Sequence, residues 1–96
     1  MKTETKKAIR EQRTIRFRAV KAGHEINHEG KWWQVVRPVE PGETITCSQG
    51  RDKEPRTFEI GDLYEGRICG YLIKRGSIET ILFAGTNALV KIIRTR

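Results

Sequence analysis

Apolar and polar residues alternate over short stretches along most of this chain, a pattern typical of half-buried β-strands. The first such strand is expected over residues 14–20. There Ile15 and Phe17 should face a core, while Arg16 and Arg18 should face outward, because successive side chains of a strand point to opposite sides. The pattern therefore predicts a strand with a basic outer face.

The same alternation recurs at intervals of about ten residues, with turn signals between the segments. The other expected strands cover residues 24–27, 32–36, 43–47, 56–60, 68–73, 78–83 and the apolar first part of 88–96. Residues 74–77 (Lys-Arg-Gly-Ser) give a clear hairpin signal between two of them. Regular short strands predict an all-β antiparallel barrel or sandwich. A barrel is favoured because a short chain must hide its sheet edges economically.

One stretch of the predicted sheet has a recognisable local pattern. Residues 23–42 contain Glu-Gly-Lys-Trp-Trp-Gln-Val-Val followed by Glu-Pro-Gly-Glu. On Gly30, Val35, Val36 and Gly42, this segment resembles the opening hairpin of SH3-like barrels of the KOW type. The resemblance implies a small SH3-like antiparallel barrel of about seven short strands. It implies no activity, since such barrels serve RNA, DNA and protein partners alike.

The N-terminal residues have a different composition. Residues 2–13 are rich in Lys, Glu and Arg, and Ala8 and Ile9 are their only apolar members. This favours a short helix or a disordered arm. We therefore expect a basic N-terminal arm over residues 1–13 and a single small β-barrel domain over residues 14–96, since 96 residues suit one domain.

Composition also indicates a compartment. No apolar run approaches the roughly 18 residues that a membrane span needs. The polar start does not resemble a signal peptide. The two cysteines, Cys47 and Cys69, lack the CxxC spacing of redox and metal motifs and are expected to be reduced core residues. These features predict a cytoplasmic protein.

The net charge of +7 is unevenly distributed along the sequence. Residues 1–21 carry a net +6, residues 22–73 a net −3 and residues 74–96 a net +4. Basic charge at both chain ends points to a polyanionic partner. Two alternatives remain open at this stage, namely a charge that serves only solubility and an acidic protein surface as partner.

One motif raises the question of metal chemistry. Residues 24–28 spell His-Glu-Ile-Asn-His, the HExxH pattern of zinc metalloproteases. That chemistry requires both histidines on one face of a helix, with the glutamate as general base. Gly23 and Gly30 bracket the motif and leave room for less than two helical turns. On the extended segment expected here, His24 and His28 stand about 13 Å apart, too far to share one zinc ion. No metal site or cofactor is therefore expected.

The remaining sequence offers no catalytic constellation, so the chain is expected not to be an enzyme. Trp32 and Trp33 are adjacent and must face opposite ways in a strand. Trp33 is expected in the core with Val35, and an outward Trp32 could stack on a nucleic-acid base unless another segment covers it.

The favoured hypothesis is a non-enzymatic small β-barrel that binds nucleic acid or associates with it, through a basic patch formed by both chain ends. DNA and RNA remain equal alternatives, and no membrane or small-molecule partner is expected. The alternative is a small protein-binding accessory or inhibitor protein, of phage or mobile-element type, that docks on a nucleoprotein enzyme. The predicted nucleic-acid-binding residues are Lys6, Lys7, Arg10, Arg13, Arg16, Arg18, Trp32, Lys91, Arg94 and Arg96.

Overall fold

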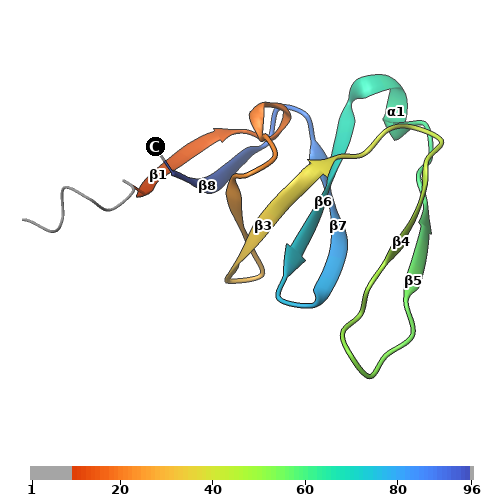
Figure 1. The fold of residues 1–96 in the computed structure, drawn as a ribbon. Helices are drawn as coiled ribbons and strands as arrows, with labels where there is room; N and C mark the ends of the chain where they lie inside the picture. Colours follow the sequence, from red (N-terminus) through yellow and green to blue (C-terminus); the bar gives the residue numbers. More distant parts are fainter. Residues whose placement is uncertain (1–9, 96) are drawn as a thin grey trace, which may run out of the picture.

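The computed structural model describes residues 10–95, which form eight β-strands and two short helical turns (Figure 1). The strands are β1 (Arg10–Arg16), β2 (Glu25–His28), β3 (Lys31–Pro38), β4 (Thr44–Cys47), β5 (Arg56–Glu59), β6 (Ile68–Arg75), β7 (Ile78–Gly85) and β8 (Leu89–Thr95). A 3-10 turn covers Phe17–Ala19, and the turn labelled α1 covers Leu63–Gly66. The predicted all-β character is confirmed.

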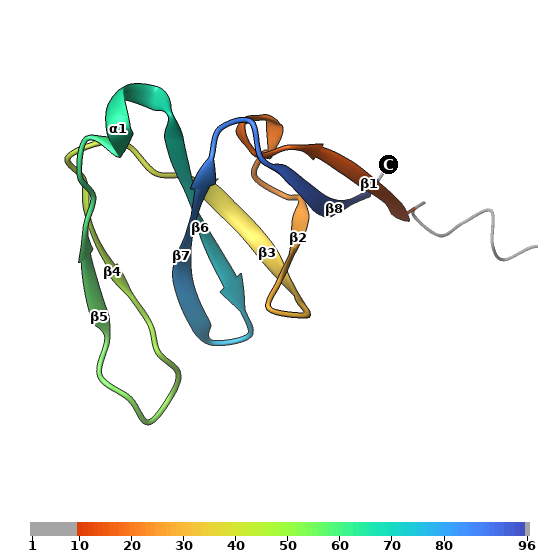
Figure 2. The ribbon, with the colours of Figure 1, turned by 180° about the vertical axis from the view of Figure 1, so that it is seen from behind.

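The strands belong to two antiparallel sheets. The larger has six strands in the order β1-β8-β2-β3-β6-β7, and the smaller contains only β4 and β5. Figure 2 shows β8, the last strand in the chain, lying between β1 and β2. β1 and β7 form the two edges of the larger sheet, so neither sheet closes on itself.

Two apolar cores lie on opposite faces of the larger sheet, and β6 contributes to both. Tyr71 and Ile73 of β6 enter the first core, while Leu72 enters the second. The face toward the first core is called the first face below, and the opposite one the second face. The first core consists of Phe17, Val20, Ile26, Val35, Tyr71, Ile73 and Ile92. The second consists of Val39, Ile45, Cys47, Ile60, Leu72 and Ile81.

The second core forms because the β4–β5 hairpin packs on β6 and β7. Ile45 and Cys47 are buried there, as their alternation with threonines predicts. The register of β3 on β6 shifts between Val35 and Arg37. Val35 enters the first core and Val36 packs against the second, as the ordinary alternation of a strand requires. The bulge then places Arg37 opposite Leu72.

The first strand differs from its prediction at both ends. It begins at Arg10, so residues 10–13 belong to the sheet and form neither a helix nor an arm. Four of its seven register pairs with β8 belong to these polar residues, and backbone pairing needs no alternation of apolar residues. Residues 1–9 lie outside the described part of the chain.

At its other end β1 stops at Arg16, and the predicted continuation to residue 20 is wrong. The chain instead turns at Phe17, whose amide donates to the Ala88 carbonyl at 2.7 Å. The Tyr71 hydroxyl donates to the Phe17 carbonyl at 2.9 Å, inside the first core. Burying Phe17 under the sheet stabilises this turn and removes Arg18 from strand alternation with Arg16.

Candidate nucleic-acid interface

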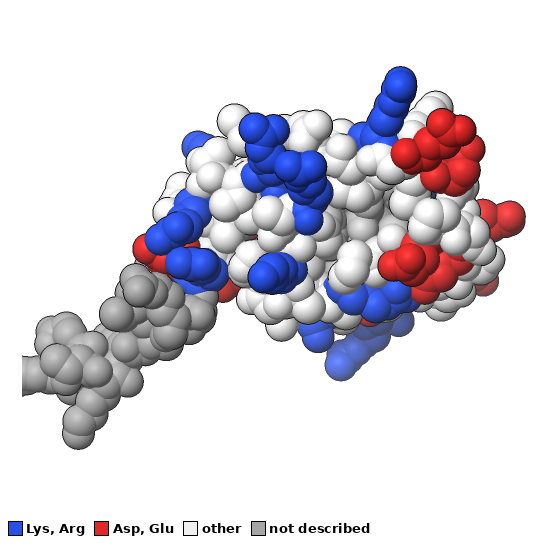
Figure 3. Space-filling view, turned by 90° about the horizontal axis from the view of Figure 1, so that it is seen from above, with Lys and Arg blue, Asp and Glu red and all other residues white. Residues whose placement is uncertain are grey.

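Pairing of the first and last strands brings the two basic ends of the sequence together, as expected. Thr14 lies opposite Lys91, and Arg13 lies opposite Ile92. In Figure 3, Lys and Arg side chains cover the end of the molecule that carries β1 and β8 and its middle, and some lie near the other end. Asp and Glu side chains gather at the opposite end, where β4 and β5 lie.

The sheet divides the predicted basic residues between its two faces. Directly opposite residues of an antiparallel pair share a face. Arg13, opposite Ile92 of the first core, therefore lies on the first face, and Arg94 follows two residues after Ile92. Arg16 and Lys91 alternate with these residues and lie on the second face.

On the first face, four cationic or ionisable side chains line a small cleft of about 290 Å³. Arg13 comes from β1, Arg94 from β8, and Lys21 and His24 from the loop between the 3-10 turn and β2. The cleft is also lined by Ile15, Ala19 and Ile92. We call these seven residues the basic cleft.

One carboxylate joins the two arginines of the basic cleft. Glu11 Oε2 accepts from Arg13 Nη2 at 2.9 Å, and Glu11 Oε1 accepts from Arg94 Nε at 3.0 Å. The hydrogen bond and charge of Glu11 raise the pKa of Arg13. Both guanidinium groups stay about half exposed, at 48% and 41% of their side-chain surface. They therefore keep further N–H groups for an anion.

His24 faces the same cleft as a neutral hydrogen-bonding group. Its Nδ1 accepts from the Lys21 amide at 3.1 Å, which places the proton of the neutral ring on Nε2. Partial burial lowers the pKa of His24, and the charges of Arg94 and Lys21 lower it further.

The HExxH motif adopts the extended form predicted for it. Residues 25–28 form β2, and His28 packs edge-on against Trp33 with ring centroids 5.9 Å apart. Within residues 10–95, no group of three or more His, Cys, Asp or Glu side chains is placed to hold a metal ion. The helical arrangement that a zinc protease needs is not formed.

Arg16 and Lys91 lie on the second face, and Arg18 lies just beyond the end of β1. Arg16 is exposed and lies 3.5 Å from Asn87 through Nη1 and Oδ1. Lys91 is exposed beside it, and Leu89, opposite Arg16, is 70% exposed. Arg18 is exposed on the 3-10 turn. The structure thus brings Arg16 and Lys91 together, but away from the basic cleft.

Trp32 lies apart from the basic residues of β1 and β8. It is half-buried on β3 and lines a shallow pocket with Glu25, Gln34, Lys74, Arg75 and Gly76. In the sheet order, β2 separates β3 from β8, so Trp32 does not join the patch at the chain ends. Trp33 packs against the first core as predicted.

Of the four remaining predicted residues, the structure describes only the backbone of one. Arg10 lies in β1 opposite Thr95. Lys6, Lys7 and Arg96 lie outside the described residues.

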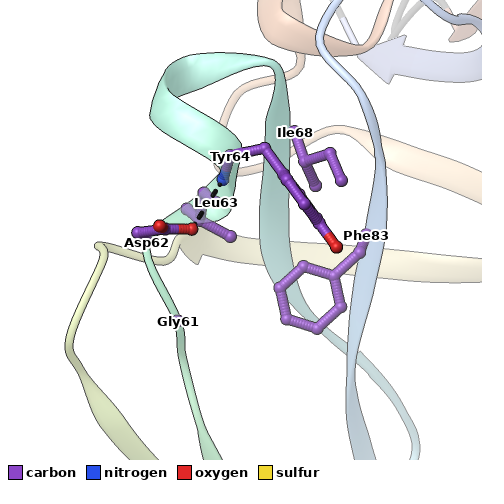
Figure 4. A pocket seen from close by; sticks show the side chains of 6 residues that line it. All are labelled: Gly61, Asp62, Leu63, Tyr64, Ile68 and Phe83. Atoms are coloured by element: carbon purple, nitrogen blue, oxygen red, sulfur yellow. Dashed lines mark hydrogen bonds between the residues drawn. The ribbon is translucent and has the colours of Figure 1, made fainter.

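A second candidate site lies beneath the α1 turn at the acidic end (Figure 4). A groove of about 400 Å³ is lined by Gly61, Asp62, Leu63, Tyr64, Ile68 and Phe83. In Figure 4 the Tyr64 side chain extends from the α1 turn toward Phe83. Tyr64 is 68% exposed and Phe83 is 41% exposed. We call this the apolar groove.

Unusual backbone geometry positions Tyr64 in that groove. Leu63, Tyr64 and Glu65 have φ values of 57°, 49° and 56°, so three consecutive L-residues are left-handed. Such a conformation costs roughly 1–2 kcal/mol per residue. The Asp62 side chain accepts from the Tyr64 amide at 2.9 Å and supports the turn.

Neither thiol is placed for nucleophilic chemistry. Cys47 is buried and Cys69 is partly buried, and both are free. Burial is the main cause that raises the pKa of each thiol. No helix among the described residues has the length and apolar character needed to cross a membrane.

Sequence reasoning missed the residues that complete both sites. Lys21 was counted only as charge, and His24 was considered only as a zinc ligand. Their convergence with Arg94 depends on the loop after Phe17, for which the sequence gives no signal. The apolar groove depends on a left-handed turn without glycine or asparagine at its three central positions.

A comparison of this chain with protein-family models, curated protein sequences and solved structures finds no match.

Proposed function

We propose that this protein is a non-enzymatic nucleic-acid-binding protein that contacts phosphates with its basic end. The observation that carries the proposal is the pairing of β1 with β8, which joins the two basic ends of the sequence. Arg13 and Arg94 act on the first face, and Arg16 and Lys91 act on the second. Because β1 is an edge strand, a nucleic-acid backbone that wraps around this edge would meet both pairs.

The opposite end of the molecule supports the same proposal. Residues 40–65 hold seven of the chain's twelve carboxylates and three basic residues. In Figure 3 most of the visible Asp and Glu side chains lie at this end. Such a dipolar surface steers a polyanion toward one end at long range. Trp32, beside Lys74 and Arg75, supplies a second contact for an unpaired base.

A salt series with two double variants tests the proposal. Fluorescence anisotropy would measure binding to labelled single-stranded and duplex oligonucleotides. Affinity should be measurable near 50 mM salt and fall steeply by about 200 mM, because each phosphate contact contributes a slope of about −0.9 on duplex DNA. Arg16→Glu with Lys91→Glu should lower both affinity and slope. Arg13→Glu with Arg94→Glu should do so as well.

The matched control changes the same charge elsewhere. Arg51→Glu with Lys53→Glu alters two exposed residues in the β4–β5 hairpin and should leave the slope unchanged. Folded protein that binds neither DNA nor RNA at low salt would refute the proposal. An equal loss in the control pair would show that net charge, and not this surface, causes binding.

The second candidate function is a protein-binding module that docks on a nucleoprotein enzyme. The apolar groove favours it, since Tyr64 and Phe83 expose aromatic surface on one side of it. Pull-downs from nuclease-treated and untreated lysate would compare the wild type with Tyr64→Ala. A partner that survives nuclease treatment and is lost in the variant supports this function, whereas loss of every partner after nuclease treatment favours nucleic acid.

We also propose that the two sheets form a partly open SH3-like barrel in a cytoplasmic protein. The support for the barrel is the second core, in which Ile45 of β4 packs with Leu72 and Ile81 of the larger sheet. The support for the compartment is the pair of free cysteines. An experimental structure and localisation of a tagged chain would test these two statements.

A further inference from the structure

Two arginines of the basic cleft already bind one anion, which shows how they recognise it. The Glu11 carboxylate lies between Arg13 Nη2 and Arg94 Nε, at 2.9 and 3.0 Å. Lys21 and His24 also line the cleft. The positive groups around the cleft therefore exceed the single carboxylate that Arg13 and Arg94 share.

We propose that the basic cleft is a binding site for one phosphate group, and that Glu11 competes with this phosphate for Arg13 and Arg94. The source of the phosphate rests on the proposed function, which supplies a nucleic acid. The proposal goes beyond that function because it assigns a single phosphate to the basic cleft and identifies Glu11 as the residue that opposes its binding.

The donor set fits phosphate better than a second carboxylate. Each guanidinium has five N–H donors in a planar fork, and only one from each is used by Glu11. Lys21 can contribute a point charge, and neutral His24 can donate from Nε2. A terminal or inorganic phosphate has at least three unesterified oxygens and a charge of about −1.5 to −2 near pH 7, so it can engage both arginines and the loop together. A backbone phosphodiester has the same single charge as a carboxylate, but its two free oxygens lie on a tetrahedral phosphorus.

Competition follows from the position of Glu11. A phosphate that approaches Arg13 and Arg94 finds their guanidinium groups already bonded to the Glu11 carboxylate, whose negative charge repels it. Either Glu11 moves away, or the phosphate binds the remaining N–H donors of the two arginines at longer distances and more weakly. Removing the charge of Glu11 while keeping its shape should therefore tighten phosphate binding, although it removes two ion pairs from the free protein.

Isothermal titration with inorganic phosphate tests this directly. Glu11→Gln should bind phosphate on the order of tenfold more tightly than the wild type, the scale of one charged hydrogen bond. Arg94→Gln should abolish the binding in either background. Glu54→Gln removes a carboxylate from the acidic end and should leave phosphate affinity unchanged. Circular dichroism would confirm folding, and Glu11→Ala serves as a second variant if Glu11→Gln unfolds.

Two oligonucleotides distinguish the sources of the phosphate. One single strand carries a 5′-phosphate, and the same strand carries a 5′-hydroxyl. A gain in Glu11→Gln for the first strand alone assigns the cleft to a terminal phosphate. An equal gain for both assigns it to the backbone, and either result supports the proposal.

Failure of the cleft and failure of the proposed function give different results. If oligonucleotides bind with the expected salt slope but phosphate affinity is the same in wild type and Glu11→Gln, the cleft proposal is wrong and the function stands. If phosphate affinity rises in Glu11→Gln and is lost in Arg94→Gln while no oligonucleotide binds, the cleft proposal stands and the proposed function is wrong.

Discussion

Gly70 shows how one missing side chain shapes this protein. It is buried in β6 opposite Phe83 of β7. A Cβ atom at Gly70 would lie 2.7 Å from Cδ1 and Cε1 of Phe83 and 3.1 Å from Cγ2 of Val39. The Phe83 ring therefore covers the glycine backbone and forms part of the apolar groove.

Gly70→Ala should lower the free energy of unfolding by about 1–3 kcal/mol, the usual range for overpacking. Urea unfolding followed by circular dichroism measures the change. Adding Phe83→Leu should restore part of the loss, because the smaller side chain gives the new methyl group room. Full additivity of the two changes would contradict this account of the contact.

His24 makes stability depend on pH in a defined direction. Its pKa in the folded protein is lowered below the ordinary value of 6.5 by burial and by Arg94 and Lys21. The unfolded chain then binds this proton more readily than the folded one. The contribution of neutral His24 is fully present above about pH 6.5 and is lost as pH falls through the folded pKa.

The test compares His24→Gln with the wild type at pH 7.5 and pH 5.5. The free energy of unfolding should fall more between these two pH values in the wild type than in the variant. The contributions of carboxylates such as Glu43 cancel in this comparison, because both proteins contain them. Identical losses in the two proteins would show that His24 does not contribute.

At the scale of elements, the α1 turn is held in an unfavourable conformation. Glu65→Gly should stabilise the protein by up to about 1 kcal/mol, because glycine adopts φ near 56° without the cost that an L-residue bears. Part of the gain is offset by the greater freedom of glycine in the unfolded chain. Gly66→Ala, at φ 90°, is the opposite control and should destabilise. Thermal melts measure both, and a destabilised Glu65→Gly would contradict the strain argument.

The elements also show what the sequence could predict. Strands β3, β4, β6 and β7 were predictable because alternation or continuous apolar runs record their burial. Residues 10–13 were not, because their strand depends on pairing with β8 more than 70 residues later. Pairing of the chain ends was predictable, and it places Arg13 close to Arg94. The loop that adds Lys21 and His24 is fixed by Phe17, whose turn has no local signature.

At the scale of the whole molecule, β6 connects two cores that would otherwise be separate. Leu72→Ala should reduce stability by about 2–5 kcal/mol. The loss should appear equally in the fluorescence of Trp32 and Trp33, which lie on β3. A tryptophan transition that keeps its wild-type midpoint in this variant would show that the cores unfold independently.

The position of β8 between β1 and β2 has a consequence for the protein during its synthesis. β1 and β2 leave the ribosome long before the strand that separates them, so the hydrogen bonds that each makes with β8 cannot form early. The nascent chain must carry two unpaired strand edges until residues 89–95 emerge. Sheets built from such distant segments fold slowly, in milliseconds to seconds. Stalled or truncated chains that lack β8 should therefore be prone to aggregation and dependent on chaperones.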